Sequence, residues 1–242
     1  MPARPKSSVQ RVSSGIPGLD ELIEGGFVKG STILVTGGTG TGKTTFCCQF
    51  LWHGLKNGEP GVYITLEEDP DDIKEDMKRY GMNFDEYEKK GIFKMVYQNP
   101  FEVSEITSNV VDIINSINAA RVVLDPISLI GMYIKDPVVL RKKLLELIRV
   151  LKRTGATILI TSEILESDMG ENVGSLSRFG VAEFVADGVI VLHFFGIGEI
   201  SSHSLLVRKM RRTKHSVDIY PFEMKRNGIV VKKNEATKTI MK

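Results

Sequence analysis

Gly37-Gly38-Thr39-Gly40-Thr41-Gly42-Lys43-Thr44 is the stretch of sequence that decides the fold of this 242-residue chain. It matches the pattern G-x-x-x-x-G-K-[ST], whose glycines let the backbone turn its N–H groups toward a phosphate. Residues 31–36 read as a buried strand and residues 43–57 as a helix, so the loop has the neighbours that this pattern requires. A purely structural turn would have no use for lysine and threonine at this spacing. The sequence therefore predicts a phosphate-binding loop between a strand and a helix.

The loop predicts a site for a nucleoside triphosphate or diphosphate, with ATP and ADP as the expected ligands and Mg²⁺ as the expected metal. Lys43 supplies a mobile cation for the β- and γ-phosphates, and the Thr44 hydroxyl is an expected Mg²⁺ ligand. The helix that begins near Lys43 adds the positive end of its dipole. The residues expected to hold the nucleotide are Gly38, Thr39, Gly40, Thr41, Gly42, Lys43, Thr44 and Thr45.

Length and cysteine content restrict the class of protein. The length suits one large α/β domain, so we expect residues 1–242 to form a single domain with its core at about 9–232 and a flexible tail at 234–242. Cys47 and Cys48 are adjacent in a predicted helix, where their side chains diverge by about 100°. We therefore expect two small buried residues rather than a metal or redox pair, in a reducing compartment.

The sequence gives no sign of secretion or of a membrane span. The first eleven residues are polar and basic without an apolar segment, unlike a signal peptide. No apolar run approaches the roughly 20 residues that a membrane helix needs. We therefore expect a cytoplasmic protein with no membrane partner.

Helix and strand patterns alternate along most of the chain, which is typical of an α/β fold with a mainly parallel central sheet flanked by helices. Apolar strands are expected at 31–36, 61–66, 92–97, 121–125 and 156–161. Helices are expected at 43–57, 70–79, 102–119 and 137–154. A polar stretch at 163–180 reads as a mobile loop. Consecutive strands joined by turns follow at 188–195, 204–210, 217–224 and 229–232, so we expect the sheet to end in antiparallel strands.

Acidic residues stand where two of the buried strands end. Ligands of open parallel sheets lie beyond the carboxyl ends of the strands, so these side chains should meet the nucleotide. Asp125 follows three apolar residues and is expected to bind Mg²⁺, directly or through water, next to Thr44. Glu67 and Glu68 end another strand, where a carboxylate could align the attacking water for hydrolysis. The alternative for this pair is an exposed loop that caps the next helix.

Two further groups of residues leave their role open. Another strand ends in Thr161-Ser162-Glu163. Of these, Thr161 and Ser162 could contact a γ-phosphate or its water, or they could bond only to the backbone. Residues 208–242 hold 11 Lys and Arg against three Asp and Glu, with a dense cluster at 209–215. This cluster could be a solvated turn, a nucleic-acid patch, or a set of cations that reach a phosphate. Lys209 and Arg211 are two residues apart on an expected strand and should point the same way, which favours a joint target.

Four segments together carry a resemblance to a known family. They are SGIPGLDEL at 14–22 with Gly25-Gly26, ITLEE at 64–68, FGVAEFVAD at 179–187 and Lys209-Met210-Arg211. With the phosphate loop, they make the chain similar to single-domain, archaeal-type members of the KaiC-like group of RecA-type ATPases. The resemblance covers about residues 9–232.

The resemblance implies a RecA-like fold, ATP hydrolysis and assembly. Glu67 matches the general base of this superfamily and Glu68 the second acid of its catalytic pair. Lys209 and Arg211 match a Lys-x-Arg motif that reaches the γ-phosphate of a neighbouring subunit. A homo-oligomer is implied, commonly a hexameric ring with ATP between subunits, and its further protein partner is unknown. Glu183-Phe184 stands where the circadian clock protein carries its phosphorylated Ser-Thr pair, so self-phosphorylation there is not expected.

Two functions from different classes follow, and a third remains open. The favoured one is an ATP-hydrolysing oligomer that acts as a regulatory or signalling switch. The alternative is a DNA-binding, recombinase-like ATPase, which the basic tail supports. Four acids in the 163–180 loop argue against it because they repel a phosphate backbone; they are Glu163, Glu166, Asp168 and Glu171, with Arg178 as the one opposing cation. The third is a module that holds ATP without hydrolysing it.

Overall fold

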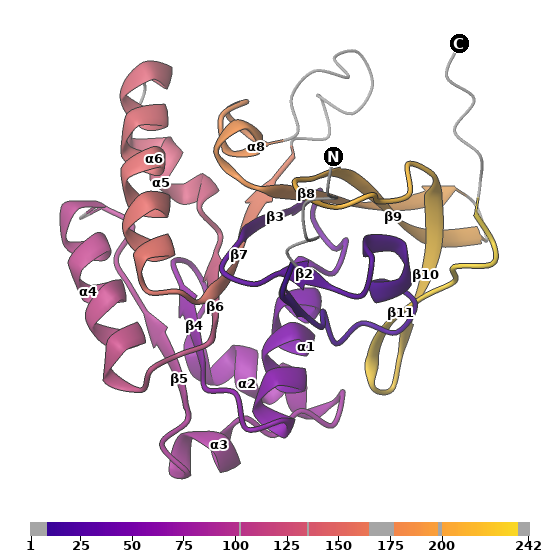
Figure 1. The fold of residues 1–242 in the computed structure, drawn as a ribbon, viewed down its shortest axis with the longest axis horizontal. Helices are drawn as coiled ribbons and strands as arrows, with labels where there is room; N and C mark the ends of the chain where they lie inside the picture. The colour runs from indigo at the N-terminus through magenta and orange to yellow at the C-terminus, as the bar shows by residue number, and fades with distance from the viewer. Residues whose placement is uncertain (1–8, 102, 135, 165–176, 198–199, 237–242) are drawn as a thin grey trace, which may run out of the picture.

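A computed structural model describes residues 9–101, 103–134, 136–164, 177–197 and 200–236 of the chain (Figure 1). Within these residues the main sheet has the strand order β11-β10-β9-β8-β3-β7-β6-β4-β5. The strands are β3 (Thr32–Gly37), β4 (Gly61–Thr65), β5 (Phe93–Tyr97), β6 (Arg121–Asp125), β7 (Thr157–Glu163), β8 (Gly188–Ile197), β9 (Ile200–Met210), β10 (Ile219–Lys225) and β11 (Gly228–Val231). The strands from β5 to β8 in this order pair in parallel, and β8, β9, β10 and β11 pair antiparallel. The predicted mainly parallel sheet with antiparallel C-terminal strands is confirmed.

The helices agree with the sequence where the pattern is long and capped. They are α1 (Lys43–Lys56), α2 (Pro70–Lys78), α3 (Asp85–Lys89), α4 (Val103–Ser116), α5 (Ser128–Tyr133), α6 (Pro137–Arg153) and α8 (Ala182–Val185). The Asp69 carboxylate accepts a hydrogen bond from Asp71 N at the start of α2, and the Asp136 carboxylate caps α6 in the same way. The short helices α3, α5 and α8 were not predicted because four to six residues carry little periodicity.

Helices cover both faces of the sheet, and each face has its own apolar core (Figure 1). Successive strand residues alternate between the faces, so Val35 and Val123 face α1 and α2 while Leu34 and Leu124 face α4 and α6. All four side chains have no solvent exposure. Cys47 and Cys48 are also fully buried on α1, which confirms that they are small core residues.

The opening segment is tied to the main sheet through buried polar side chains. This segment contains β1 (Arg11–Val12), η1 (Asp20–Ile23) and β2 (Phe27–Val28), and β1 pairs with β2 as a separate two-stranded sheet. The Gln49 amide on α1 donates to Gly15 O at 3.1 Å and to Ile229 O at 3.0 Å, and it accepts from Ile229 N at 2.7 Å. One side chain thus joins α1 to the opening segment and to β11.

Three expectations need correction or lie outside the described residues. The apolar strand expected at 156–161 runs on to Glu163, so Glu163 belongs to the strand end, as one reading of the sequence had it, and not to the loop expected at 163–180. Residues 165–176, with Glu166, Asp168 and Glu171, and residues 237–242 of the tail lie outside the described residues.

Across the residues that the structure does describe, no helix has the length and apolar character needed to cross a membrane.

Candidate active site

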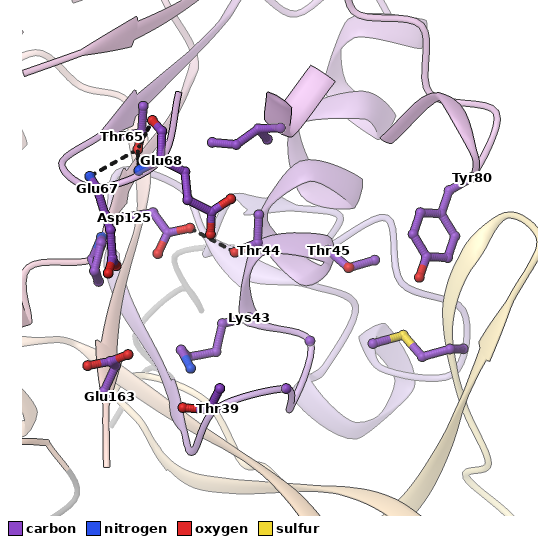
Figure 2. A pocket seen from close by; sticks show the side chains of 15 residues that line it. Thr39, Lys43, Thr44, Thr45, Thr65, Glu67, Glu68, Tyr80, Asp125 and Glu163 are labelled. Carbon is purple, nitrogen blue, oxygen red and sulfur yellow. Dashed lines mark hydrogen bonds between the residues drawn. The ribbon is translucent and has the colours of Figure 1, made fainter. Parts of the chain in front are cut away.

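A pocket of about 500 Å³ opens where the carboxyl ends of β3, β4, β6 and β7 meet (Figure 2). These strands are neighbours in the order β3-β7-β6-β4, so their ends lie side by side. The pocket is lined by most of the predicted loop and by the predicted acids; these are Thr39, Gly40, Gly42, Lys43, Thr44, Thr45, Glu67, Glu68 and Asp125. The structure therefore brings the predicted loop and the predicted acids together in one place.

The phosphate-loop sequence adopts a tight turn between β3 and α1. Gly40 and Gly42 have φ angles of 73° and 91°, in the left-handed region that glycine adopts without strain. A Cβ atom on Gly42 would stand only 2.2 Å from Met224 Cε of β10. The Thr41 hydroxyl is buried and donates to Gly38 O at 2.9 Å, so this side chain braces the loop from within.

Lys43 is the cation of the pocket floor. Its Nζ donates to Gly37 O at 3.1 Å and to Gly38 O at 2.8 Å, which keeps the ammonium inside the curve of the loop. Burial lowers the pKa of Lys43, while the nearby charge of Asp125 and then that of Glu163 act in the opposite direction.

Thr44 and Asp125 meet although they are far apart in the sequence. The Thr44 hydroxyl donates to Asp125 Oδ2 at 3.2 Å, and Figure 2 shows this contact in the middle of the pocket. Asp125 is only 8% exposed. A hydroxyl and a carboxylate are both oxygen ligands that Mg²⁺ accepts beside phosphate and water, so this pair fits a magnesium ion.

Two more hydroxyls hold Asp125 from the strands on either side of β6. Tyr63 on β4 donates to Asp125 Oδ2, and Thr161 on β7 donates to Asp125 Oδ1. Burial, followed by the charge of Asp125, raises the pKa of Tyr63, so its phenol stays protonated and remains a donor. The Thr161 hydroxyl thus bonds to a carboxylate, which neither of the two roles expected from the sequence had included.

Glu67 and Glu68 project from a turn that one threonine organises. The Thr65 hydroxyl accepts from Glu67 N at 3.2 Å and from Glu68 N at 3.0 Å, and it donates to Glu68 O at 2.9 Å (Figure 2). Both carboxylates line the pocket. Burial raises the pKa of Glu67, and Glu163 and Asp125 add to this effect. Burial also raises the pKa of Glu68, with further contributions from Asp125 and Glu67.

Glu163 is a site residue that we did not single out in the sequence. It is the last residue of β7, lines the pocket, and pairs with Arg178 at 3.1 Å. The sequence placed Glu163 with Thr161 and Ser162 at the end of a strand, where side chains should meet the ligand, but only Thr161 and Ser162 were given a possible role there. The Ser162 hydroxyl donates to Glu163 O at 3.4 Å, so it has a backbone partner.

Apolar and aromatic side chains also line the pocket, and they were not predicted. They are Ile73 on α2, Tyr80 in the turn that follows α2, and Met224 on β10. Figure 2 shows Tyr80 across the pocket from Asp125 and Glu163, beyond Thr45. No motif connects these three residues, since only the packing of α2 and β10 around α1 brings them together. The pocket thus has a polar end at the loop and an apolar end at Tyr80.

Lys209 and Arg211 do not line this pocket. Lys209 Nζ donates to Glu183 O at 3.0 Å and to Ala186 O at 2.7 Å, at the end of α8. Burial, together with the charge of Arg211, lowers the pKa of Lys209. Arg211 stands 3.6 Å from Asp187, and its side chain is 57% exposed. The expectation that both residues lie on one strand was wrong, because β9 ends at Met210 and Arg211 lies in the following turn.

The basic tail is partly neutralised by ion pairs. Lys225 and Lys232 both pair with Glu223, at 3.2 Å and 3.0 Å. Lys233 pairs with Glu21 of η1 at 2.7 Å. Three lysines of the basic tail therefore have acidic partners.

Comparisons with known proteins identify similar sequences and a similar structure. The sequence model of a family described as "ATPase: KaiC" matches residues 12–236. A UPF0273 protein of Methanopyrus kandleri is 37% identical over 93% of this chain and 92% of its own length. The circadian clock protein KaiC3 of Synechocystis is 29% identical, and the match spans 92% of this chain but 46% of that protein. The crystal structure of a KaiC-like protein from Pyrococcus horikoshii is 45% identical with a TM-score of 0.83, covering 92% of this chain and 99% of that one.

The cluster of acids makes a direct electrostatic prediction. Glu163→Gln removes a negative charge that raises the pKa of Glu67, and it leaves the Arg178 charge in place, so the pKa of Glu67 should fall. The carboxylate signal of Glu67 in a carbon-13 NMR titration, assigned with Glu67→Gln, should then titrate at lower pH. Glu146→Gln on the exposed face of α6 is the control and should not move it. An unchanged titration in Glu163→Gln would contradict the interpretation.

Proposed function

Because the chain belongs to the KaiC family of ATPases, we propose that it is a Mg²⁺-dependent ATPase that works as a regulatory homo-oligomer. The observation that carries this proposal is the contact between Thr44 and Asp125 at the end of the phosphate loop. This contact joins the two oxygen ligands that a nucleotide-bound magnesium ion needs from the protein. Bound Mg²⁺ would neutralise charge on the β- and γ-phosphates during transfer.

The loop residues are proposed to bind the phosphates. The main-chain N–H groups of residues 38–45 and the start of α1 favour anions. Lys43 lies within the loop and is a flexible side chain, so its ammonium can turn from the Gly37 and Gly38 carbonyls to phosphate oxygens. The Thr44 proton is already donated to Asp125, which leaves the lone pairs of its oxygen for the metal.

Glu67 is proposed to align and deprotonate the attacking water, with Glu68 assisting. Both carboxylates enter the pocket from the rigid turn after β4. A carboxylate acts as a base only in its ionised form, and its strength as a base rises with its pKa. The raised pKa of Glu67 therefore makes its ionised form a stronger base than an ordinary glutamate. The same environment makes simple helix capping an incomplete explanation of the acidic pair.

The apolar end of the pocket is proposed to receive the nucleotide base. Bases bind against aromatic and apolar side chains, and Tyr80, Ile73 and Met224 provide such surfaces beyond the loop. The polar end would then hold the triphosphate. This division fits a whole nucleotide better than an isolated phosphate.

Assembly is proposed to bring Arg211 to the γ-phosphate of a neighbouring subunit, with Lys209 beside it, in a ring of six. Neither residue reaches the pocket of its own chain, and Arg211 is largely exposed.

The alternative of a DNA-binding recombinase has less support, because Lys225, Lys232 and Lys233 already pair with acids. Tight and steeply salt-dependent binding to single-stranded DNA would favour this alternative.

Two variants separate binding from hydrolysis. Lys43→Ala removes the phosphate-binding cation and should abolish binding of ATP–Mg²⁺ in calorimetry. Glu67→Gln should keep that binding but lower ATP turnover by about a hundredfold or more, the usual size of a general-base effect. Phosphate release and light scattering with and without ATP–Mg²⁺ measure turnover and assembly together. Wild-type protein that binds ATP without any phosphate release would instead be a module that only holds ATP.

The base-binding role of Tyr80 has its own test. Tyr80→Ala should weaken ADP binding by about tenfold or more, the usual loss when an aromatic stacking partner is removed. Binding of inorganic tripolyphosphate should not change, since this ligand has no base. Tyr80→Phe keeps the ring, and Tyr133→Ala removes an exposed ring outside the pocket; both should bind ADP normally. Equal losses for ADP and tripolyphosphate would show that Tyr80 only supports the fold.

Complementation tests the role of Arg211 across a subunit boundary. Arg211→Met should assemble normally but lose about a thousandfold or more in turnover, as for other arginine fingers. Mixed with Lys43→Ala, which is inactive but retains Arg211, it should regain activity at the interfaces that combine an intact loop with an intact Arg211. No recovery in mixed oligomers of confirmed composition would place Arg211 in its own subunit's site or outside catalysis.

A further inference from the structure

The hydroxyls of Tyr63 and Thr161 hold both oxygens of Asp125 from the buried side of the carboxylate. Tyr63 and Thr161 are fully buried, and each donates to a different carboxylate oxygen. They come from opposite sides, because β4 and β7 flank β6 in the sheet. With Thr44 as the third donor, three hydroxyls from three elements meet on one carboxylate.

This arrangement restricts the orientation of the carboxylate. The terminal torsion of an aspartate is soft, so an Asp125 side chain without partners could rotate over a wide range. Donors on both oxygens from opposite sides remove that freedom. An ionised carboxylate has about four acceptor positions, and the three hydroxyls leave at least one of them for a metal ion or its water. The network therefore orients Asp125 without saturating it.

An apolar side chain at position 63 would have served the fold equally well. The neighbouring β4 residues Val62 and Ile64 are apolar and fully buried, and the ring of Tyr63 packs in the core beneath α1. A buried phenol needs a hydrogen-bond partner. The partner of Tyr63 is Asp125, which also accepts a hydrogen bond from Thr44. The position of the hydroxyl thus relates to the metal pair more directly than to packing.

We propose that Tyr63 and Thr161 are positioning residues for magnesium, which fix the Asp125 carboxylate in the orientation that binds the ion with Thr44. This inference rests on the proposed function, because it concerns the same nucleotide site. Neither residue is proposed to touch the nucleotide, so both act through Asp125. Tyr63 also lies on the strand that leads to Glu67, and Thr161 on the strand that ends at Glu163. The network therefore sets the metal side of the pocket relative to its acids.

The test measures how strongly Mg²⁺ enhances ADP binding. Calorimetry with Mg²⁺ and with EDTA gives two affinities, and their ratio reports the coupling between metal and nucleotide. Tyr63→Phe and Thr161→Val remove a hydroxyl and keep the shape of the side chain. Each should lower this ratio about tenfold, as expected for one hydrogen bond to a charged group. The affinity measured in EDTA should stay within about twofold.

Conservative variants serve as the controls. Thr161→Ser keeps the hydroxyl and should keep the full ratio. Tyr220→Phe removes another phenol, whose oxygen lies 2.7 Å from Ser216 Oγ. This phenol does not line the pocket, so its loss should also leave the ratio unchanged. Thermal unfolding of each variant without ligand confirms that it is folded. The pair Thr161→Ser and Thr161→Val decides the question if Tyr63→Phe does not fold.

Two results would overturn the inference. An undiminished ratio in Tyr63→Phe and Thr161→Val would show that the hydroxyls do not position Asp125 for the ion. Equal losses with Mg²⁺ and with EDTA would assign them a structural role. If the wild-type protein itself shows no Mg²⁺-dependent ADP binding, the proposed function fails, and this outcome is distinct from the other two.

Discussion

One buried carboxylate, that of Asp125, connects the elements on which the rest of the site depends. Hydroxyls from α1, β4 and β7 donate to it while it stands at the end of β6. A buried charge without partners is strongly destabilising, so these donors are a requirement of the fold as well as of the site. Because the same contacts set the spacing between the phosphate loop and the strand ends, the stability of the core and the geometry of the pocket are coupled.

The charge balance of the pocket explains why several binding elements must act together. Lys43 lies near the charges of Asp125, Glu163 and Glu67. Glu163 and Asp125 also raise the pKa of Glu67 beyond the effect of burial. A triphosphate would bring still more negative charge into this region. Within the proposed function, main-chain N–H groups, Lys43 and a divalent cation would therefore all be needed on physical grounds.

The sequence predicted the parts of the site that depend on local order. The loop, the acids at the ends of β4 and β6, and the caps Asp69 and Asp136 follow from neighbouring residues alone. Tyr80 and Met224 could not be predicted in this way, since their position depends on how α2 and β10 pack around α1. Tyr63 offered a signal that we did not use, because a tyrosine inside an apolar buried strand requires a polar partner.

The two cations of the Lys-x-Arg segment differ in a way that the sequence does not show. Lys209 donates to two main-chain carbonyls at the end of α8, and burial lowers its pKa. Moving it to a phosphate in another subunit would leave these carbonyls without that donor, at a cost comparable to lost hydrogen bonds. The Arg211 side chain pairs with Asp187 at 3.6 Å and is largely exposed, so it can move at little cost. Within the proposed ring, Lys209 would therefore keep the 183–187 segment in place, and Arg211 would be the group that reaches the neighbour.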